Sequence, residues 1–414
     1  MKRIYLDNAA TTPVDPDVLA EMMPYFSEKF GNSSSFHSFG QEANEAVELA
    51  RSRAAKHFNC TPEEIVFTSG ATESNNLAIK GLTRKFLEKN KDTGVKPHII
   101  TLSFEHHCVL DNCKAVEDEG LGEVTFVLPE VDGVIDPKKV MEAIRPNTVL
   151  ISIMYVNNEI GTVQPIAELG KLIKEANKTR EQKIVFHTDA TQAIDYFDCD
   201  VDRLGVDLLS MSAHKIYGPK GVGMLYIRKG TPITKIQAGG GHERKMRAGT
   251  LNVTGIVGLG KALEMIDLKK GKKIGELRDY FVNRVLTEIP DTVLNGSKEN
   301  RSPNNANISF HNVEGESLLM LLDMEGIACS TGSACSSDSL APSHVLLSIG
   351  KKHEEAHGSI RITLGKYNTK EEMDYTVEKM KEAAAKLRKV SGGVLEDFYK
   401  ENKDGVVEDQ HHDH

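Results

Sequence analysis

Short apolar runs alternate with longer amphipathic stretches through the middle of the chain. The runs occupy residues 64–69, 98–103, 148–154, 183–188, 207–212 and 221–227. Helical patterns follow the first two runs, at 71–89 and 107–120. Continuous Val, Ile and Leu runs that alternate with helices are typical of a parallel sheet covered on both faces. The pattern therefore predicts an α/β fold with a mostly parallel sheet.

The pattern changes near residues 260–285, where a long charged helix begins. Strands at "NISFHNV" and "SIRITLG" and a closing helix at 369–389 follow it, which predicts a smaller α+β domain. The chain has 414 residues, which is more than one hydrophobic core usually organises. Two domains are therefore expected. The expected division is a large domain at 17–262, a small domain at 1–16 and 263–390, and a mobile tail at 391–414.

Polar residues directly follow five of the predicted strands. In a parallel sheet the ligand lies beyond the carboxyl ends of the strands. A single polar residue there is most often a helix cap, but five such groups in one sheet predict a binding site. The residues are Thr72, His106, Asn158, Asp189, Gln192, Ser212, His214 and Lys215.

Composition narrows the possible partners. The net charge of −9 gives no electrostatic reason to bind nucleic acid or an anionic membrane. No apolar run is long enough for a transmembrane helix or a signal peptide. The cysteines are sparse, without a CxxC pair, which predicts a reducing cytoplasm; they are Cys60, Cys108, Cys113, Cys199, Cys329 and Cys335.

The strand-end residues match the needs of pyridoxal phosphate. "SGATES" at the start of a helix is suited to a phosphate group, although the pattern alone is weak. Lys215, between a buried strand and a Gly/Pro turn, is suited to a Schiff base, and Asp189 to the pyridine nitrogen. Gln192 is placed to reach the phenolic oxygen and His106 to stack on the ring. Each also has a plain reading, as a helix cap, a core histidine or a surface lysine.

Two residues of the second domain complete the candidate chemistry. Arg361, in "RITLG", is suited to binding an amino acid carboxylate through two hydrogen bonds, and equally to an ordinary ion pair. Cys335 lies in "ACSTGSACSSDS", among small polar residues that would neither bury it nor prepare it for a permanent disulfide.

Nine motifs together resemble the cysteine desulfurases of the NifS/IscS type. They are "YLDNAATTP", "FTSGATESNN", "EHHCVL", "NNEIGTVQPI", "HTDATQA", "SAHKIYGPKG", "GGGHERKMRAGTLN", "STGSACSS" and "SIRITLG", in this order over about residues 4–390. The resemblance implies a fold-type-I enzyme, similar to aspartate aminotransferase, that uses pyridoxal 5'-phosphate as a homodimer. It also implies conversion of L-cysteine to L-alanine, with a persulfide left on an active-site cysteine.

The resemblance also implies roles for individual residues. Lys215 would carry the cofactor, His106 would stack on its ring and move protons, and Cys335 would accept the sulfur. Asp189 and Gln192 would bind the ring nitrogen and the phenolic oxygen, and Asn158 and Arg361 the substrate carboxylate. The phosphate group would be held by Ala71, Thr72, Ser212 and His214, and by Thr250 from the other subunit.

The "TGSAC" sequence resembles the long-loop group of this family, which passes sulfur to an iron–sulfur scaffold protein. A flexible loop would let Cys335 reach the pocket and then the partner. No metal site is expected, apart from a transient iron–sulfur cluster that Cys335 would ligate together with a scaffold. Ser33 stands where the family often has proline, which would loosen one loop. Cys108 and Cys329 are expected to be structural.

Two other functions remain open at this point. A selenocysteine lyase or an aminotransferase would use the same cofactor, but transamination does not need Cys335. A sulfur-carrier docking subunit with an inactive site would bind no cofactor. The filled catalytic positions favour an active enzyme.

Overall fold

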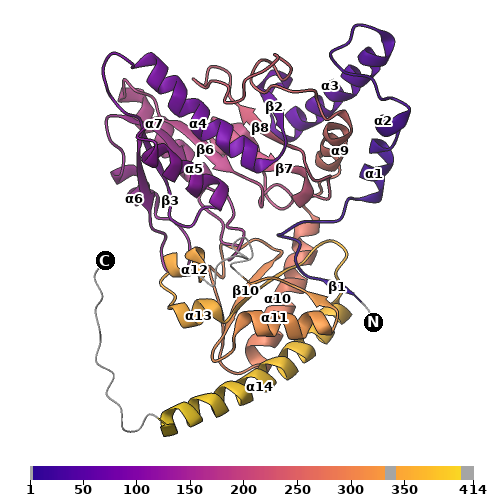
Figure 1. Cartoon of the computed structure of the whole chain (residues 1–414), viewed down its shortest axis with the longest axis vertical. Coiled ribbons are helices and arrows are strands. Elements are labelled where there is room, and N and C mark those ends of the chain that lie inside the picture. The colour runs from indigo at the N-terminus through magenta and orange to yellow at the C-terminus, as the bar shows by residue number, and fades with distance from the viewer. Residues whose placement is uncertain (1–2, 332–341, 402–414) are drawn as a thin grey trace.

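The computed structural model describes residues 3–331 and 342–401. Its centre is a seven-stranded sheet with the order β2-β8-β7-β6-β5-β3-β4 (Figure 1). The strands are β2 (Ile65–Thr68), β3 (His98–Leu102), β4 (Glu123–Val127), β5 (Thr148–Ser152), β6 (Val185–Asp189), β7 (Leu208–Ser212) and β8 (Gly223–Ile227). The six predicted strands are confirmed, and β8 runs antiparallel to both of its neighbours. Strand β4 was missed because it is a half-exposed edge strand without a continuous apolar run.

Helices cover both faces of this sheet. They are α1 (Pro16–Met22), α2 (Pro24–Ser27), α3 (Ser38–Phe58), α4 (Ala71–Lys89), α5 (His107–Asp118), α6 (Pro137–Glu142), α7 (Ile166–Thr179), α8 (Val201–Leu204) and α9 (Val253–Glu264). Successive strand residues point to opposite faces. Thus Phe67 joins the hydrophobic cluster that includes α3 and α9, whereas Val66 joins the cluster under α4 and α5. Burial of both faces explains the continuous apolar runs.

The C-terminal part forms a second layer, drawn in orange and yellow in Figure 1. Strands β9 (Thr292–Leu294), β10 (Asn305–Phe310) and β12 (Ser359–Thr363) form an antiparallel sheet, and β1 (Ile4–Tyr5) pairs with β11 (Ile327–Ala328). The helices are α10 (Lys270–Glu288), α11 (Gly315–Met324), α12 (His344–Ser348), α13 (His353–His357) and α14 (Lys370–Glu401). Ile4 and Leu6 share a hydrophobic cluster with Phe281 and Ile360. This shared cluster supports the proposed assignment of the N-terminal segment to the small domain.

Two features differ from the simple division into domains. Val345 and Leu346 of α12 pack into the hydrophobic cluster of the large sheet, so this short helix bridges the two layers. Helix α14 continues to Glu401 instead of ending near residue 389. The pair Gly392 and Gly393 has low helix propensity, so the residue pattern gives no sign of this continuation. The remainder of the expected tail, 402–414, lies outside the described residues.

Membrane insertion finds no support among the helices that the structure describes. None of them combines the length and the apolar character needed to cross a bilayer.

Candidate active site

The five predicted strand ends converge on one cavity of about 560 Å³. Ten of the predicted site residues line it: Ala71, Thr72, His106, Asn158, Asp189, Gln192, Ser212, His214, Lys215 and Arg361. Thr250 is exposed and is not among the lining residues. Cys335 lies outside the described residues. The convergence follows from the parallel strands, whose carboxyl ends share one edge of the sheet.

One end of the cavity is formed by the start of α4. Gly70 is the N-cap residue and supplies no side-chain acceptor to the first turn. Strand β8 passes so close that a Cβ on Gly223 would lie 2.7 Å from the Cα of Gly70. Because Gly70, Ala71 and Thr72 line the cavity, the N-terminus of this 19-residue helix faces it with its backbone N–H groups and positive dipole end. Burial lowers the pKa of the neighbouring His214 to about 4, so this imidazole is neutral at pH 7.

Lys215 is held by a segment from the other end of the chain. It follows β7 in a short 3-10 helix, Ala213–Lys215, and its Nζ donates to the carbonyl oxygens of Ala9 and Ala10, the latter at 2.7 Å. Tyr217, two residues on, has a φ of 63°. Its N–H donates to Thr12 Oγ1 at 2.8 Å, which helps to hold this left-handed backbone. Residues 9–12 belong to the motif "YLDNAATTP", but no role at the cavity was predicted for them.

Both carboxylate oxygens of Asp189 accept hydrogen bonds. Asn75 Nδ2 donates to Oδ2 at 2.7 Å, and the backbone N–H of Thr191 donates to Oδ1 at 3.0 Å. Asn75 is fully buried on α4. The pair fixes the orientation of a carboxylate that lines the cavity. Sequence reasoning missed Asn75, and its only sign was the "ATESNN" motif.

His106 is the N-cap of α5. Its Nδ1 accepts the backbone N–H of Cys108 at 3.1 Å. Burial lowers the pKa of His106, and the positive charge of Lys215 adds to this effect, while Asp189 opposes it. The ring is therefore neutral at pH 7.

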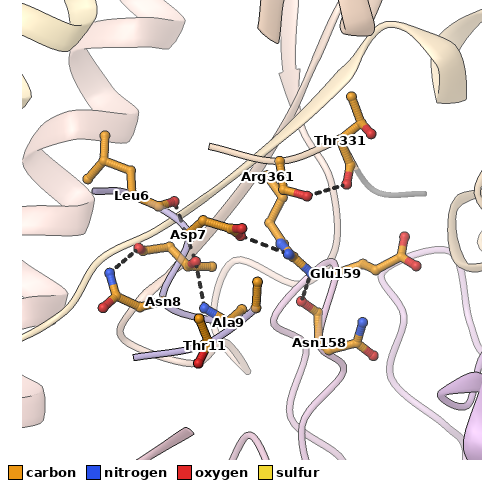
Figure 2. Close-up of polar contacts among 12 residues, drawn as sticks. Leu6, Asp7, Asn8, Ala9, Thr11, Asn158, Glu159, Thr331 and Arg361 are labelled. Atoms are coloured by element: carbon orange, nitrogen blue, oxygen red, sulfur yellow. Dashed lines mark hydrogen bonds and ion pairs between the residues drawn. The ribbon is translucent and has the colours of Figure 1, made fainter. Parts of the chain in front are cut away.

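Arg361 lies between the N-terminal segment at Asp7 and the segment at Asn158 (Figure 2). Its guanidinium donates to Asp7 Oδ1 at 2.9 Å and to the Asn158 carbonyl oxygen at 3.1 Å. Arg361 Nε and Asn158 Oδ1 are buried and have no hydrogen-bond partner among the described residues. Buried polar atoms are costly when unpaired. A ligand with polar groups in this cavity would give both atoms a hydrogen-bond partner. The ion pair with Asp7 uses a different nitrogen of Arg361 and leaves Nε available.

Both described ends of the segment that contains Cys335 are attached beside the cavity. Ser330 exchanges backbone hydrogen bonds with Arg361. Beyond the gap, the Ser343 hydroxyl donates to the Glu159 carboxylate. Glu159 follows Asn158 directly, and burial raises its pKa to about 7. Ser330 and Ser343, on the two sides of this segment, thus both lie next to residues that line the cavity or directly follow one that does.

The cavity residues fit pyridoxal 5'-phosphate. A helix N-terminus faces the same space as an amine, an oriented carboxylate and a neutral imidazole. The unpaired Arg361 Nε adds a donor for a carboxylate, and the unpaired Asn158 Oδ1 adds an acceptor for an N–H or O–H group. These are the groups that a phosphate, a pyridine ring and an amino acid substrate require.

The comparisons with known proteins define the class first. The family model described as aminotransferase class-V matches residues 4–376. A solved structure described as a NifS-like protein superposes with a TM-score of 0.85 at 39% identity, and covers 93% of this chain and 100% of its own. The chain belongs to the class-V aminotransferases, which are pyridoxal-phosphate enzymes with the fold of aspartate aminotransferase.

Its relatives within that class are cysteine desulfurases. The chain is 52% identical over 395 residues to cysteine desulfurase IscS of Dictyoglomus turgidum, covering 94% of this chain and 97% of the relative. It is 48% identical over 393 residues to cysteine desulfurase IscS of Methanosarcina thermophila, covering 94% of each. A solved structure of SspA in complex with cysteine is 40% identical, with a TM-score of 0.77, over 89% of this chain and all of that one. The chain is thus a member of the cysteine desulfurase family.

Proposed function

We propose that this protein converts L-cysteine to L-alanine with pyridoxal 5'-phosphate and leaves the sulfur as a persulfide on Cys335. The reaction balances, because the Cβ–S bond of the substrate breaks and an S–S bond to Cys335 forms. The substrate carbon skeleton keeps the electron pair, takes a proton and becomes alanine. One observation carries the proposal: the two attachment points of the Cys335 segment lie beside the cavity that unites Lys215, Asp189 and His106.

Residues of the cavity would hold the cofactor at four points. Lys215 would bind it covalently, Asp189 would keep its ring nitrogen protonated, and Gln192 would donate to its phenolic oxygen. When bound, the cofactor supplies an electron sink for the charge left when the substrate loses its Cα proton. The phosphate group would be held by Ala71, Thr72, Ser212 and His214, with Thr250 from a second subunit.

The proton transfers would be carried by His106 and by the Lys215 amine. Burial lowers the pKa of His106, so the ring is neutral at pH 7 and would pass on the proton that it carries. Asn158 Oδ1 is free of partners among the described residues and would orient the substrate. Arg361 would bind the substrate carboxylate through the N–H groups that Asp7 and the Asn158 carbonyl leave unused.

Product analysis of single variants tests this proposal. Purified protein is given L-cysteine and a thiol reductant, and alanine and sulfide are counted. The wild type is expected to release equal amounts of alanine and sulfide. Lys215→Ala is expected to be inactive. Cys335→Ser is expected to bind the cofactor but not to turn over L-cysteine. Alanine from Cys335→Ser at the wild-type rate would instead indicate a lyase with another sulfur acceptor.

We further propose a homodimer. Several large apolar side chains on α2, the following loop and the start of α3 are exposed, with Phe30 65% and Phe36 94% accessible. Exposed apolar groups that gather on one arm of a molecule usually mark an interface. The exposed Thr250 would then meet the cavity of the partner. A monomer by light scattering, with the cofactor fully bound, would contradict this assembly.

The sulfur acceptor would be an iron–sulfur scaffold protein, with Cys335 able to share a transient cluster with it. The "TGSAC" motif and the IscS relatives support this acceptor. We place the protein in the cytoplasm, since the described cysteines are free thiols, as a reducing compartment requires. Transfer of labelled sulfur from loaded enzyme to a purified scaffold tests the acceptor. Retention of all label on the enzyme would count against it.

A further inference from the structure

Cys108 lines the cavity, yet the proposed reaction gives it no task. Its Sγ accepts a hydrogen bond of 3.0 Å from Asn75 Nδ2 and lies 3.0 Å from His106 Nδ1. The same Asn75 amide donates to Asp189 Oδ2 at 2.7 Å. The thiol is therefore part of a continuous chain of contacts that joins the carboxylate of Asp189 to the imidazole of His106.

The backbone fixes the direction of the last contact in this chain. The N–H of Cys108 donates to Nδ1 of His106 at 3.1 Å, so that nitrogen presents a lone pair and carries no proton. Because Sγ already accepts from Asn75, its own S–H is left to donate to the same lone pair. A neutral imidazole that accepts at Nδ1 carries its proton on Nε2.

The thiol keeps its proton in this environment. Burial raises the pKa of Cys108 far above its usual range, and the charge of Asp189 adds to the shift. A protonated thiol is a weak nucleophile. Cys108 is thus poorly suited to compete with Cys335 for sulfur, but it is available as a hydrogen-bond donor.

We propose that Cys108 is a positioning residue that holds His106 as its neutral Nε2–H tautomer through a thiol hydrogen bond to Nδ1. The importance of that tautomer for catalysis rests on the proposed function. The bond stabilises the neutral ring and so acts in the same direction as burial. The other titratable groups whose charges act on His106, or with which it interacts, are Asp189, Lys215, His107, Asp111 and His344.

Nitrogen NMR of histidine-labelled protein tests the bond without turnover. The protein carries its cofactor and no substrate, and the His106 signal is identified by its loss in His106→Gln. Cys108→Ala removes one of the two donors to Nδ1, so the pKa of His106 is expected to rise by about half a unit. The acid limb of the kcat/KM profile is expected to move to higher pH by a similar amount.

Two further variants separate the hydrogen bond from side-chain size. Cys108→Ser keeps a donor of similar size and is expected to keep the wild-type His106 pKa and Nε2–H signal. Cys113→Ala makes the same deletion on the same helix, at a fully buried thiol that makes no hydrogen bond to His106 among the described residues, and is expected to leave both unchanged. Thermal unfolding and cofactor absorbance verify that each variant is folded and loaded.

An unchanged His106 pKa in Cys108→Ala would overturn the proposal, as would equal shifts in the Ala and Ser variants. A wild-type signal from an Nδ1–H tautomer would also overturn it. None of these results depends on desulfurase activity. Failure of the positioning role is therefore distinguishable from failure of the proposed function.

Discussion

Burial sets the charge state of the side chains around the cavity. It lowers the pKa of His214 to about 4 and raises that of Glu159 to about 7. If they were exposed, the pKa of His214 would lie near 6.5 and that of Glu159 near 4.5. Hydrogen bonding fixes the orientation of Asp189, since Asn75 and the Thr191 N–H each donate to one of its two oxygens. The chemistry of each residue is therefore decided by its neighbours as much as by its type.

Asn75→Ala should slow the reaction about tenfold in kcat, because one oxygen of Asp189 loses its oriented donor. Steady-state kinetics measure the change, with KM expected to move less. Asn90→Ala, at the far end of α4, is the control and should leave kcat unaltered. A wild-type kcat in Asn75→Ala would show that Asp189 does not need this partner.

A buried ion pair joins helix α3 to the segment before Thr250. Arg51 donates to Glu243 at 2.7 and 3.0 Å, and both side chains are almost fully buried. Glu243 also accepts the backbone N–H of Phe67 in β2 at 2.8 Å. The pair thus connects a helix, a strand and the segment that would reach a partner subunit.

Arg51→Met should lower the free energy of unfolding by about 3–5 kcal/mol, because Glu243 would stay buried without its counter-charge. Urea unfolding followed by circular dichroism measures the loss. Arg145→Met breaks a pair with Glu123 whose side chains are 49% and 51% exposed, and should cost less than about 1 kcal/mol. Similar losses in both variants would contradict the reading of Arg51–Glu243 as a buried pair.

The two layers of the molecule meet at a small cavity lined by groups from both. Asp195 lies there with Tyr217, from the segment between β7 and β8, and with Lys366 and Ile274 of the second layer. Burial raises the pKa of Asp195 to about 7, while Lys366 and Lys270 oppose the rise. The junction therefore holds a carboxyl group that resists ionisation in the folded state.

This group makes the stability of the whole molecule depend on pH. Its folded-state pKa lies above the unfolded value of 3.8, so its contribution to stability falls as the pH rises from about 4 to 7. Asp195→Asn should therefore have a higher free energy of unfolding than wild type at pH 8, by on the order of 2–4 kcal/mol. The difference should vanish near pH 4. Urea unfolding at both pH values measures this.

Glu175→Gln, a side chain that is 70% exposed, is the matched carboxyl-to-amide control and should show no such pH dependence. A stability difference for Asp195→Asn that is equal at pH 4 and pH 8 would indicate altered packing instead of altered ionisation.

The residue pattern was sufficient for the local features of the sheet and its ends. Apolar runs marked six strands because both faces of the sheet are buried, and polar residues after five of them marked the cavity. Lys215, Asp189 and His106 were found this way because Asp189 ends its strand and the other two lie within a few residues of the ends of theirs. The edge strand β4 was not found because it lacks a continuous apolar run, and the continuation of α14 was not found because Gly392 and Gly393 disfavour a helix.

The contacts between distant segments could come only from the folded chain. Asn75 meets Asp189, 114 residues away, and Ala10 meets Lys215, 205 residues away. Strand order and packing bring these groups together, and a one-dimensional pattern does not specify strand order. For the same reason, burial and the charge states that follow from it appear only when the chain has folded around each side chain. The types of group at the cavity are thus written along the chain, whereas their partners and protonation depend on the packing of the whole molecule.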